Sequence, residues 1–364
     1  MTPETMPDEF EPVRVGVVGL GYWGPNLMRN LNEIETADLR WICDADQSRL
    51  DVALKRYPAV RASRSFGDLL ADPELEAVVI ATPVSSHHPL ALAALEAGKH
   101  VLVEKPLAAS AAEASGLAAA AEARGLLLMP GHTFLYSPPV NKIRDVLEAG
   151  SLGDIYFISM SRVNLGQHQS DVSVTWDLGP HDFSILHYWL GETPSHVSAM
   201  SRSCIFPQIP DVTFINLQYE SGAIAHIELS WLAPSKLRRT TIVGSEAMVV
   251  YDDVSVEPVR IFDSKVLLRD PHSFGEYQLS YRTGDILAPA MSPVEPLELE
   301  MDDFCRAVRT GAVPRSTASL GIEVVRLIEA VDASLASNGE RIPLGDEALD
   351  VALRERVVPA PLGA

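Results

Sequence analysis

Hydrophobic positions in the first third of the chain form short apolar runs, separated by stretches of helical periodicity. The runs predict strands at Val13–Gly19, Asp38–Cys43, Ala77–Ala81, His100–Val103 and Leu126–Met129. The stretches between them predict helices that include Pro25–Leu31, Pro89–Ala97 and Ser110–Ala123. Strand and helix alternating at this spacing are typical of βαβ units. Residues 13–135 are therefore predicted to form a doubly wound parallel sheet of the α/β class.

The pattern changes after about Asn141, where β-rich runs become long and a predicted helix over Lys142–Ala149 ends at a glycine. Seven strands are predicted here, at Ile155–Val163, His196–Met200, Thr213–Tyr219, Ala223–Trp231, Thr240–Val243, Ala247–Tyr251 and Val259–Leu267. Two late helices, Leu297–Arg309 and Leu320–Ser337, carry apolar stripes. We predict a second, α+β domain over residues 136–364 with one large open, mainly antiparallel sheet. Helices 297–337 are expected to pack back on the chain, and residues 1–12 to form a flexible N-terminus.

Composition narrows the classes of function. The chain has 364 residues and a formal net charge of −20, which argues against nucleic acid and anionic membrane surfaces as partners. No apolar run is long enough to span a membrane. The acidic start of the chain shows no export signal. The three cysteines, Cys43, Cys204 and Cys305, are odd in number and contain no CxxC motif. We expect a cytoplasmic protein without a disulfide framework.

The first predicted strand runs directly into the motif Gly19-Leu20-Gly21-Tyr22-Trp23-Gly24, followed by Pro25. In a GxGxxG turn the first glycine permits the tight turn, the second lets a pyrophosphate approach, and the third lets helix and strand pack closely. Proline suits the first helical turn, and the free N–H groups there attract a diphosphate. The motif opens a βαβ unit, so it predicts a Rossmann dinucleotide site.

Asp44 ends the next strand, 25 residues after Gly19. A carboxylate at this place accepts hydrogen bonds from the adenosine ribose and repels a 2′-phosphate, which favours NAD over NADP. Alternatively, Asp44 caps the following helix, although Asp46 is equally suited to that role. Arg49 is a possible phosphate partner and keeps NADP open as the less favoured cofactor.

A second motif, Glu104-Lys105-Pro106, ends the strand that begins at His100. Ligands bind along the carboxyl edge of such a sheet, where a lysine can polarise a hydroxyl or carbonyl group. Pro106 restricts Lys105 to extended geometry and is a candidate for a cis bond. The alternative is a solvated lysine at a strand end, but the chain contains only six lysines.

A third segment, from Thr175 to Leu186, predicts the start of a helix that carries Asp177 and His181 four residues apart. On a helix the two side chains share one face, so a carboxylate can orient an imidazole that acts as a general base. The alternatives are an N-cap role for Asp177 and a hydrogen-bonded, partly buried role for His181.

Together with Thr82-Pro83, these motifs resemble the family of glucose–fructose oxidoreductases and inositol dehydrogenases. The resemblance runs from Val13 to about Leu344. The segments Trp176–Leu186 and Ser230–Lys236 are similar to the branch of sugar-nucleotide 3-dehydrogenases, which oxidise UDP-N-acetylglucosamine or its uronate at C3. The segment Gly131–Tyr136 lacks the Asn-x-Arg motif that many relatives that oxidise free sugars carry at the corresponding place.

The resemblance implies an NAD-dependent dehydrogenase and a homodimer or homotetramer formed through the open sheet. It makes His181 the acid/base, with Asp177 as the acid that precedes it, and Lys105 the residue that stabilises the developing oxyanion. Residues expected to line the cofactor are Gly19, Leu20, Gly21, Tyr22, Trp23, Gly24, Asp44, Thr82, Pro83, His87, Glu104 and Lys105. Substrate contacts are expected from His132, Tyr136, Arg162 and Asn164, although Arg162 and Asn164 also fit an ordinary sheet face.

We assign no catalytic role to two further groups of polar residues, a histidine pair and a basic cluster. His87-His88 lacks a carboxylate at ligand spacing, so no metal is expected. The basic cluster Lys236, Arg238 and Arg239 either binds a phosphate or protects an edge strand, and we favour the edge strand. A cyclitol dehydrogenase, an antibiotic-sugar ketoreductase and a non-catalytic NAD-binding sensor remain alternative functions.

Overall fold

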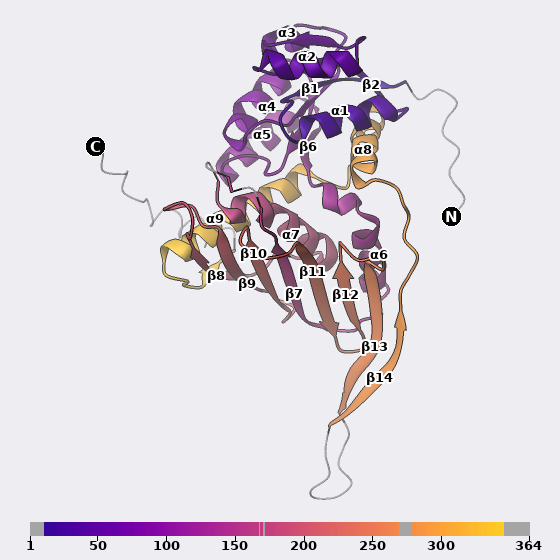
Figure 1. Ribbon diagram of the computed structural model, residues 1–364, viewed down its shortest axis with the longest axis vertical. Helices are drawn as coiled ribbons and strands as arrows, with labels where there is room; N and C mark the ends of the chain where they lie inside the picture. The colour runs from indigo at the N-terminus through magenta and orange to yellow at the C-terminus, as the bar shows by residue number, and fades with distance from the viewer. Residues whose placement is uncertain (1–10, 167, 170–171, 269–278, 346–364) are drawn as a thin grey trace, which may run out of the picture. The chain divides into compact units, whose positions relative to one another are not determined.

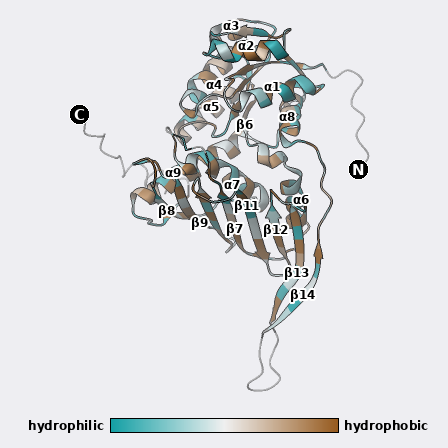
Figure 2. Ribbon diagram, viewed as in Figure 1, coloured by the Kyte–Doolittle hydropathy of each residue, from teal (hydrophilic) through white to brown (hydrophobic). Residues whose placement is uncertain are grey.

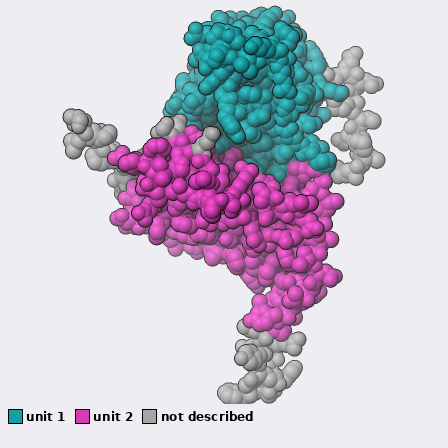
Figure 3. Space-filling view, in the orientation of Figure 1, with its two compact units in different colours: residues 1–137, 293–325 teal, residues 138–292, 326–364 magenta. Residues whose placement is uncertain are grey.

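The structure is a computed structural model of the chain that describes residues 11–166, 168–169, 172–268 and 279–345. Of residues 1–12, which were expected to form a flexible N-terminus, residues 1–10 lie outside the described part. The chain divides into two compact units, one of residues 1–137 and 293–325 and the other of residues 138–292 and 326–364 (Figure 3). The first boundary lies two residues beyond the predicted position 135. Residues 293–325, which the sequence placed in the second domain, belong to the first unit.

The first unit is built on a six-stranded sheet in which each pair of neighbouring strands is parallel (Figure 1). Its order, β3-β2-β1-β4-β5-β6, is that of a doubly wound Rossmann sheet. The strands are β1 (Val13–Val18), β2 (Ala37–Cys43), β3 (Arg61–Ser63), β4 (Ala77–Ile80), β5 (His100–Glu104) and β6 (Leu128–Gly131). The interior strands β1 and β4 are almost wholly apolar and buried, as expected for strands covered on both faces.

The helices of this unit follow the strands in the predicted alternation. They are α1 (Gly24–Glu33), α2 (Gln47–Arg56), α3 (Phe66–Leu70), α4 (His87–Glu96) and α5 (Ala111–Glu122), with 3₁₀ turns η1 (Val84–Ser86) and η2 (Thr133–Tyr136). Asp46 caps α2 by accepting a hydrogen bond from Ser48 N at 2.9 Å, and Ser110 caps α5. The capping role weighed for Asp44 thus belongs to Asp46.

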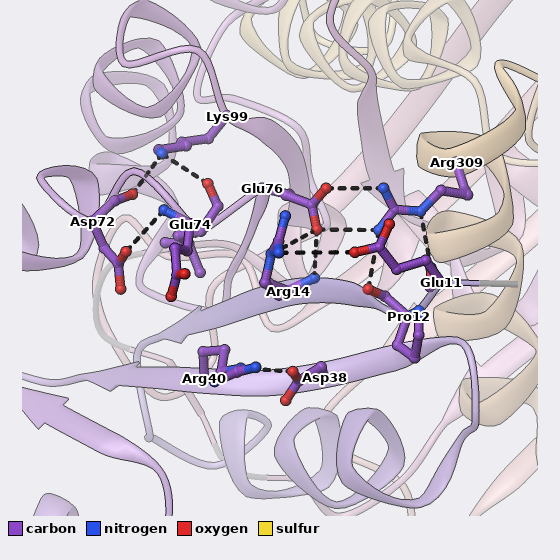
Figure 4. Close-up of polar contacts among 11 residues, drawn as sticks. Glu11, Pro12, Arg14, Asp38, Arg40, Asp72, Glu74, Glu76, Lys99 and Arg309 are labelled. Atoms are coloured by element: carbon purple, nitrogen blue, oxygen red, sulfur yellow. Dashed lines mark hydrogen bonds and ion pairs between the residues drawn. The ribbon is translucent and has the colours of Figure 1, made fainter.

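Helix α8 (Pro296–Thr310) returns from late in the sequence to complete the first unit. At its last turn Arg309 pairs with both carboxylate oxygens of Glu76 and donates to the carbonyls of Glu11 and Pro12 (Figure 4). Near the other end Arg29 makes a bidentate ion pair with Glu295 at 2.6 and 2.9 Å. These pairs fix α8 against the start of β1 and against α1.

The second unit is built on a nine-stranded sheet of order β14-β13-β12-β11-β7-β10-β9-β8-β15 (Figure 1). Only the pair β7–β10 is parallel among the pairings within it. The strands are β7 (Ile155–Val163), β8 (His196–Arg202), β9 (Val212–Gln218), β10 (Ile224–Ser230), β11 (Leu237–Gly244), β12 (Met248–Asp252), β13 (Val259–Leu268), β14 (Leu279–Leu287) and β15 (Ile342–Pro343). The predicted open, mainly antiparallel sheet is therefore present, with β14 and the two-residue β15 as strands that the pattern did not predict.

Helices α6 (Pro138–Glu148), α7 (Val174–Leu190) and α9 (Ala318–Ala336) complete the element order. Strand β9 alternates buried and exposed residues, so one sheet face is covered and the other open (Figure 2). Thr175 on α7 donates a hydrogen bond to Thr213 of β9 at 3.1 Å, which places α7 on the covered face.

The favoured interpretation of the basic cluster is wrong. Strand β11, which carries Arg238 and Arg239, lies between β12 and β7 inside the sheet rather than at its edge. Arg238 forms an ion pair with Asp253 at 3.0 Å. In the described part of the chain, no helix is long and apolar enough to cross a membrane.

Candidate active site

The glycine-rich turn between β1 and α1 has no room for larger side chains at two of its positions. Gly19 has a φ of +91°, and a Cβ there would lie 2.4 Å from the carbonyl oxygen of Ala81. A Cβ on Gly24 would lie 2.0 Å from the carbonyl oxygen of Gly19. At Gly21 the nearest atom to such a Cβ is Arg49 Nη1, at 3.8 Å, so this side of the turn is open to a ligand.

Helix α1 begins directly at this turn. Its N-cap, Trp23, makes no side-chain capping hydrogen bond, and Pro25 occupies the first turn. The N–H groups at this end are therefore directed out of the helix, where they attract a phosphate. Leu20 is buried, whereas Tyr22 is 87% exposed and stacks on Trp23 at a centroid distance of 6.5 Å.

Asp44 lies at the end of β2, beside the glycine-rich turn. Its Oδ2 accepts a hydrogen bond from Leu20 N at 2.6 Å, and its Oδ1 accepts one from Asp46 N at 2.8 Å. Arg49 Nη1 approaches Oδ2 at 3.4 Å. The residue is 7% exposed and its carboxylate is fixed in orientation, and Oδ1, which accepts the hydrogen bond from Asp46 N, has a second lone pair for a ribose hydroxyl group.

His87 connects the two turns at the ends of β4 and β5. Its Nε2 lies 2.8 Å from the carbonyl oxygen of Thr82, and its Nδ1 lies 2.8 Å from that of Pro106. Burial lowers the pKa of His87, and the side chain is only 1% exposed. His87 therefore lies between the Thr82-Pro83 turn and the Lys105-Pro106 turn, and as a neutral imidazole with one N–H it donates to one of the two carbonyl oxygens. The Lys105–Pro106 bond is cis, as the sequence suggested.

Glu104, at the end of β5, is a buried carboxyl group. Its Oε2 accepts a hydrogen bond from Lys105 N at 3.3 Å, and the nearby Trp23 side chain acts to lower the pKa of the carboxyl group. Burial raises the pKa of Glu104 to about 7, because the neighbouring Lys105 offsets only part of the cost of burying the charge. The group therefore titrates near neutral pH immediately beside Lys105.

His132 follows β6, the strand next to β5. Burial and repulsion from Lys105 lower the pKa of His132 to about 3, so the imidazole is neutral. The ring is 1% exposed, and within the described part of the chain neither nitrogen has a hydrogen-bond partner. An unsatisfied buried imidazole beside the motif lysine suits a polar ligand group.

Glu300 belongs to the same buried cluster, although the sequence analysis missed it. Its Oε2 accepts a hydrogen bond from Thr133 Oγ1 at 2.6 Å, and burial together with repulsion from Glu104 raises its pKa well above the usual value. One signal was present in the sequence: Glu300 falls on the apolar stripe of α8 that includes Leu297 and Phe304. A carboxyl group on a buried face is uncommon and identifies a candidate site residue.

Tyr136 has contacts typical of a structural residue. Its hydroxyl group donates to Asp303 Oδ2 at 2.7 Å and accepts a bond from Ser316 N at 3.3 Å. The Arg315 guanidinium lies 5.0 Å from the ring centroid, and Tyr136 is 2% exposed. The substrate contact expected for Tyr136 is not among these interactions, because the side chain is enclosed within the first unit.

Asp177 and His181 lie in the second unit, on helix α7. The N-cap of α7 is Ser173, which accepts a bond from Trp176 N, so Asp177 does not cap this helix. Asp177 Oδ2 instead accepts a hydrogen bond from the indole Nε1 of Trp231 at 3.2 Å. The four-residue spacing places Asp177 and His181 on the same face of α7, as predicted, although the helix contains Pro180 between them.

The two remaining candidates, Arg162 and Asn164, come from the end of β7 and the residues after it. Arg162 is 5% exposed and forms a bidentate ion pair with Asp182 at 2.8 and 2.9 Å. Asn164 Oδ1 is buried and, among the described residues, has no hydrogen-bond donor. Asn164 therefore retains a polar atom that a substrate hydroxyl group can use.

The first unit thus has the features of a dinucleotide site: a turn that accepts only glycine at two positions, an uncapped helix N-terminus and an oriented carboxylate. These fit the diphosphate and ribose of NAD. Lys105 ends a strand of the same sheet edge, and α7 of the second unit presents an aspartate and a histidine. The fold and residues define a two-unit NAD-binding oxidoreductase.

Comparison with known proteins gives the family. Residues 13–132 match the model described as "Oxidoreductase family, NAD-binding Rossmann fold", and residues 140–250 match the C-terminal domain of glucose–fructose oxidoreductase, inositol dehydrogenase and MocA proteins. The chain belongs to this family. It is an NAD(P)-dependent dehydrogenase that acts on CH–OH groups, as the resemblance implied.

Three similar proteins illustrate the range of the family. The chain is 26% identical to scyllo-inositol 2-dehydrogenase (NAD(+)) from Bacillus subtilis over 329 residues, which cover 86% of this chain and 92% of that protein. A crystal structure of GenD2 from gentamicin A biosynthesis in complex with NAD is 25% identical, with a TM-score of 0.78 and 92% and 97% of the two chains covered. UDP-N-acetylglucosamine 3-dehydrogenase from Acidithiobacillus ferrooxidans shares the fold at 23% identity, with a TM-score of 0.76 and coverage of 90% and 99%.

Proposed function

We propose that this dehydrogenase oxidises a secondary alcohol, at C3, of a nucleotide-linked hexose with NAD as the cofactor. The observation that carries the proposal is the Asp177–His181 pair on α7, beside the strand end at Trp231, in segments similar to the sugar-nucleotide 3-dehydrogenases. The named UDP-N-acetylglucosamine 3-dehydrogenase with the same fold supports this substrate class.

Each residue has a chemical task in this proposal. His181 accepts the hydroxyl proton of the substrate, and Asp177 orients the imidazole. The Lys105 ammonium stabilises the oxyanion that develops at the same oxygen. His132 and Asn164 supply unsatisfied polar atoms for substrate hydroxyl groups. Bound NAD supplies the hydride acceptor.

The cofactor is held by the first unit. The N-terminus of α1 binds the diphosphate, and Asp44 binds the adenosine ribose. Thr82 and Pro83 lie on the nicotinamide side, next to His87. Because Glu104 and Lys105 end the neighbouring strand of this parallel sheet, they are placed on the same edge.

A second candidate is a cyclitol dehydrogenase. It is favoured by the scyllo-inositol 2-dehydrogenase at 26% identity and by a myo-inositol 2-dehydrogenase from Thermotoga maritima at 25% over 264 residues. The same catalytic residues serve both substrates, because each presents a secondary alcohol on a six-membered ring. The two candidates differ only in whether a nucleotide must be bound.

The test is turnover of a panel of nucleotide sugars, free hexoses and inositols with NAD, followed by the absorbance of NADH. Oxidation of a nucleotide sugar supports the first proposal, whereas turnover of inositols alone refutes it in favour of the second. Lys105→Ala should lower kcat by on the order of 10²–10³-fold. Unchanged turnover by this variant would refute the role of Lys105.

We further propose that the open face of the nine-stranded sheet forms the contact of a homodimer or homotetramer. This face exposes Phe157, Met200, Phe214 and Ile224, which come from adjacent strands in register. An exposed apolar group of this kind on a sheet face favours association. Sedimentation of the wild type and of Phe214→Glu tests this: a smaller species for the variant supports the interface, and equal masses refute it.

A further inference from the structure

Trp231 makes a direct contact with the proposed catalytic aspartate. Its indole Nε1 donates a hydrogen bond to Asp177 Oδ2 at 3.2 Å, across 54 residues of sequence. Trp231 is the residue immediately after β10, and Asp177 lies in the first turn of α7. The hydrogen bond therefore joins the end of a strand to the start of the helix that carries both Asp177 and His181.

The backbone of Trp231 is fixed on both sides. Its N–H donates to the carbonyl oxygen of Asp211 at 2.9 Å, and its carbonyl oxygen accepts a bond from Gly166 N at 3.1 Å. Strand β10, which precedes it, is hydrogen-bonded to β7 on one side and β9 on the other. The indole is thus attached to an interior part of the sheet rather than to a free loop.

The ring of Trp231 is held as closely as its backbone. It is 2% exposed and lies against His168, with ring centroids 5.4 Å apart. At Gly166 a Cβ would lie 3.1 Å from the indole Cδ1, so a glycine allows this close approach.

An indole N–H is a donor only and does not change its protonation state with pH, so it suits a carboxylate acceptor. A hydrogen bond to a charged group is stronger than one between neutral groups. With Oδ2 of Asp177 held, the plane of the carboxylate and the direction of Oδ1 are restricted. An aspartate that orients a general base must itself be oriented to do so.

We propose that Trp231 is a positioning residue that acts through Asp177, holding its carboxylate in the orientation in which it aligns His181. The inference rests on the proposed function, since it assigns Asp177 to the reaction. Trp231 itself contacts neither the reacting atoms nor the cofactor in this scheme.

Trp231→Phe tests the proposal because it removes the N–H and keeps an aromatic ring. The matched control is Trp189→Phe, which also removes a buried indole that donates one hydrogen bond, here to the carbonyl oxygen of Val140 at 2.9 Å. Trp231→Phe should lower kcat between about tenfold and a hundredfold with KM unchanged, the range expected for a hydrogen bond to a charged group. Trp189→Phe should keep kcat at a similar cost in melting temperature. Equal kcat values for the two variants would overturn the proposal.

A second measurement does not depend on activity. The chain has five tryptophans, so a ¹⁵N-indole spectrum is simple, and Trp231→Phe assigns the Trp231 resonance by its loss. In Asp177→Ala that resonance should move upfield and its N–H should exchange faster with solvent, while the Trp189 resonance stays in place. An unchanged Trp231 resonance overturns the inference, even if the wild type oxidises no substrate and the proposed function fails separately.

Discussion

Replacing Glu104 with glutamine should remove a pH-dependent loss of stability from the first unit. The folded chain raises the pKa of this buried carboxyl group from its usual value of 4.5 to about 7. Between those values the folded chain retains a proton that the unfolded chain has lost. The free energy of unfolding therefore falls as the pH rises from about 4.5 to about 7 and is constant for this group above that range.

The size of the effect follows from the width of that interval. At about 1.4 kcal/mol for each pH unit, the interval from 4.5 to about 7 amounts to about 3 kcal/mol. Glutamine resembles the protonated acid and does not ionise, so Glu104→Gln avoids this cost. For a unit of this size, about 3 kcal/mol corresponds to a change in Tm on the order of 10 °C.

The assay is the melting temperature of the cofactor-free protein from pH 5 to pH 8, for the wild type and Glu104→Gln. The difference between the two proteins should increase with pH and level off above about 7. Buried histidines with lowered pKa values change stability in the opposite direction in both proteins and cancel in this difference. Glu122→Gln, at an exposed position on α5, controls for the loss of one charge. Parallel curves for the wild type and Glu104→Gln would refute the buried-acid argument.

Three further substitutions test other parts of the structure. Gly24→Ala should abolish NAD binding by calorimetry, because its Cβ would lie 2.0 Å from the carbonyl oxygen of Gly19; retained affinity would contradict this. Asp44→Ala should weaken NAD more than NADP, since it removes the ribose acceptor and the repulsion of a 2′-phosphate, and an unchanged preference in Kd would exclude that role. Arg162→Met should lower the free energy of unfolding, measured in urea, by about 3–5 kcal/mol, because it leaves Asp182 buried and unpaired. The double variant Arg162→Met with Asp182→Leu should recover most of this loss. Equal losses in the two variants would show instead that the ion pair itself stabilises the fold.

Much of the fold could be predicted because its signals are local. The βαβ alternation and the glycine-rich turn depend on periodicity and on steric limits within a few residues, and both appear as expected. Strand β14 was missed because its sequence, with Arg282, Gly284 and Asp285, does not show a buried run. Strand β11 was correctly predicted as a strand but wrongly placed at an edge, because strand order depends on pairings distant in sequence.

In the candidate site, too, some features could be predicted from the sequence and others could not. Gly19, Asp44 and the cis bond after Lys105 follow from short motifs and were predictable. Burial and long-range contacts could not be predicted from the sequence. Tyr136 is enclosed by residues from α8 onward, and Arg162 is paired with Asp182 across the sheet–helix interface. The indole bond from Trp231 to Asp177 could not be predicted either, since nothing in the local sequence connects the two residues.

The return of α8 to the first unit has a consequence for biosynthesis. Arg309 closes this unit by binding Glu76 and the backbone at Glu11 and Pro12, yet it is synthesised 233 residues after Glu76. On the ribosome, the six strands of the first sheet emerge long before α8, and eight of the nine strands of the second sheet, β7 to β14, must be made in between. The nascent dinucleotide-binding unit is therefore incomplete for most of translation, and the surface that α8 later covers is exposed during that time.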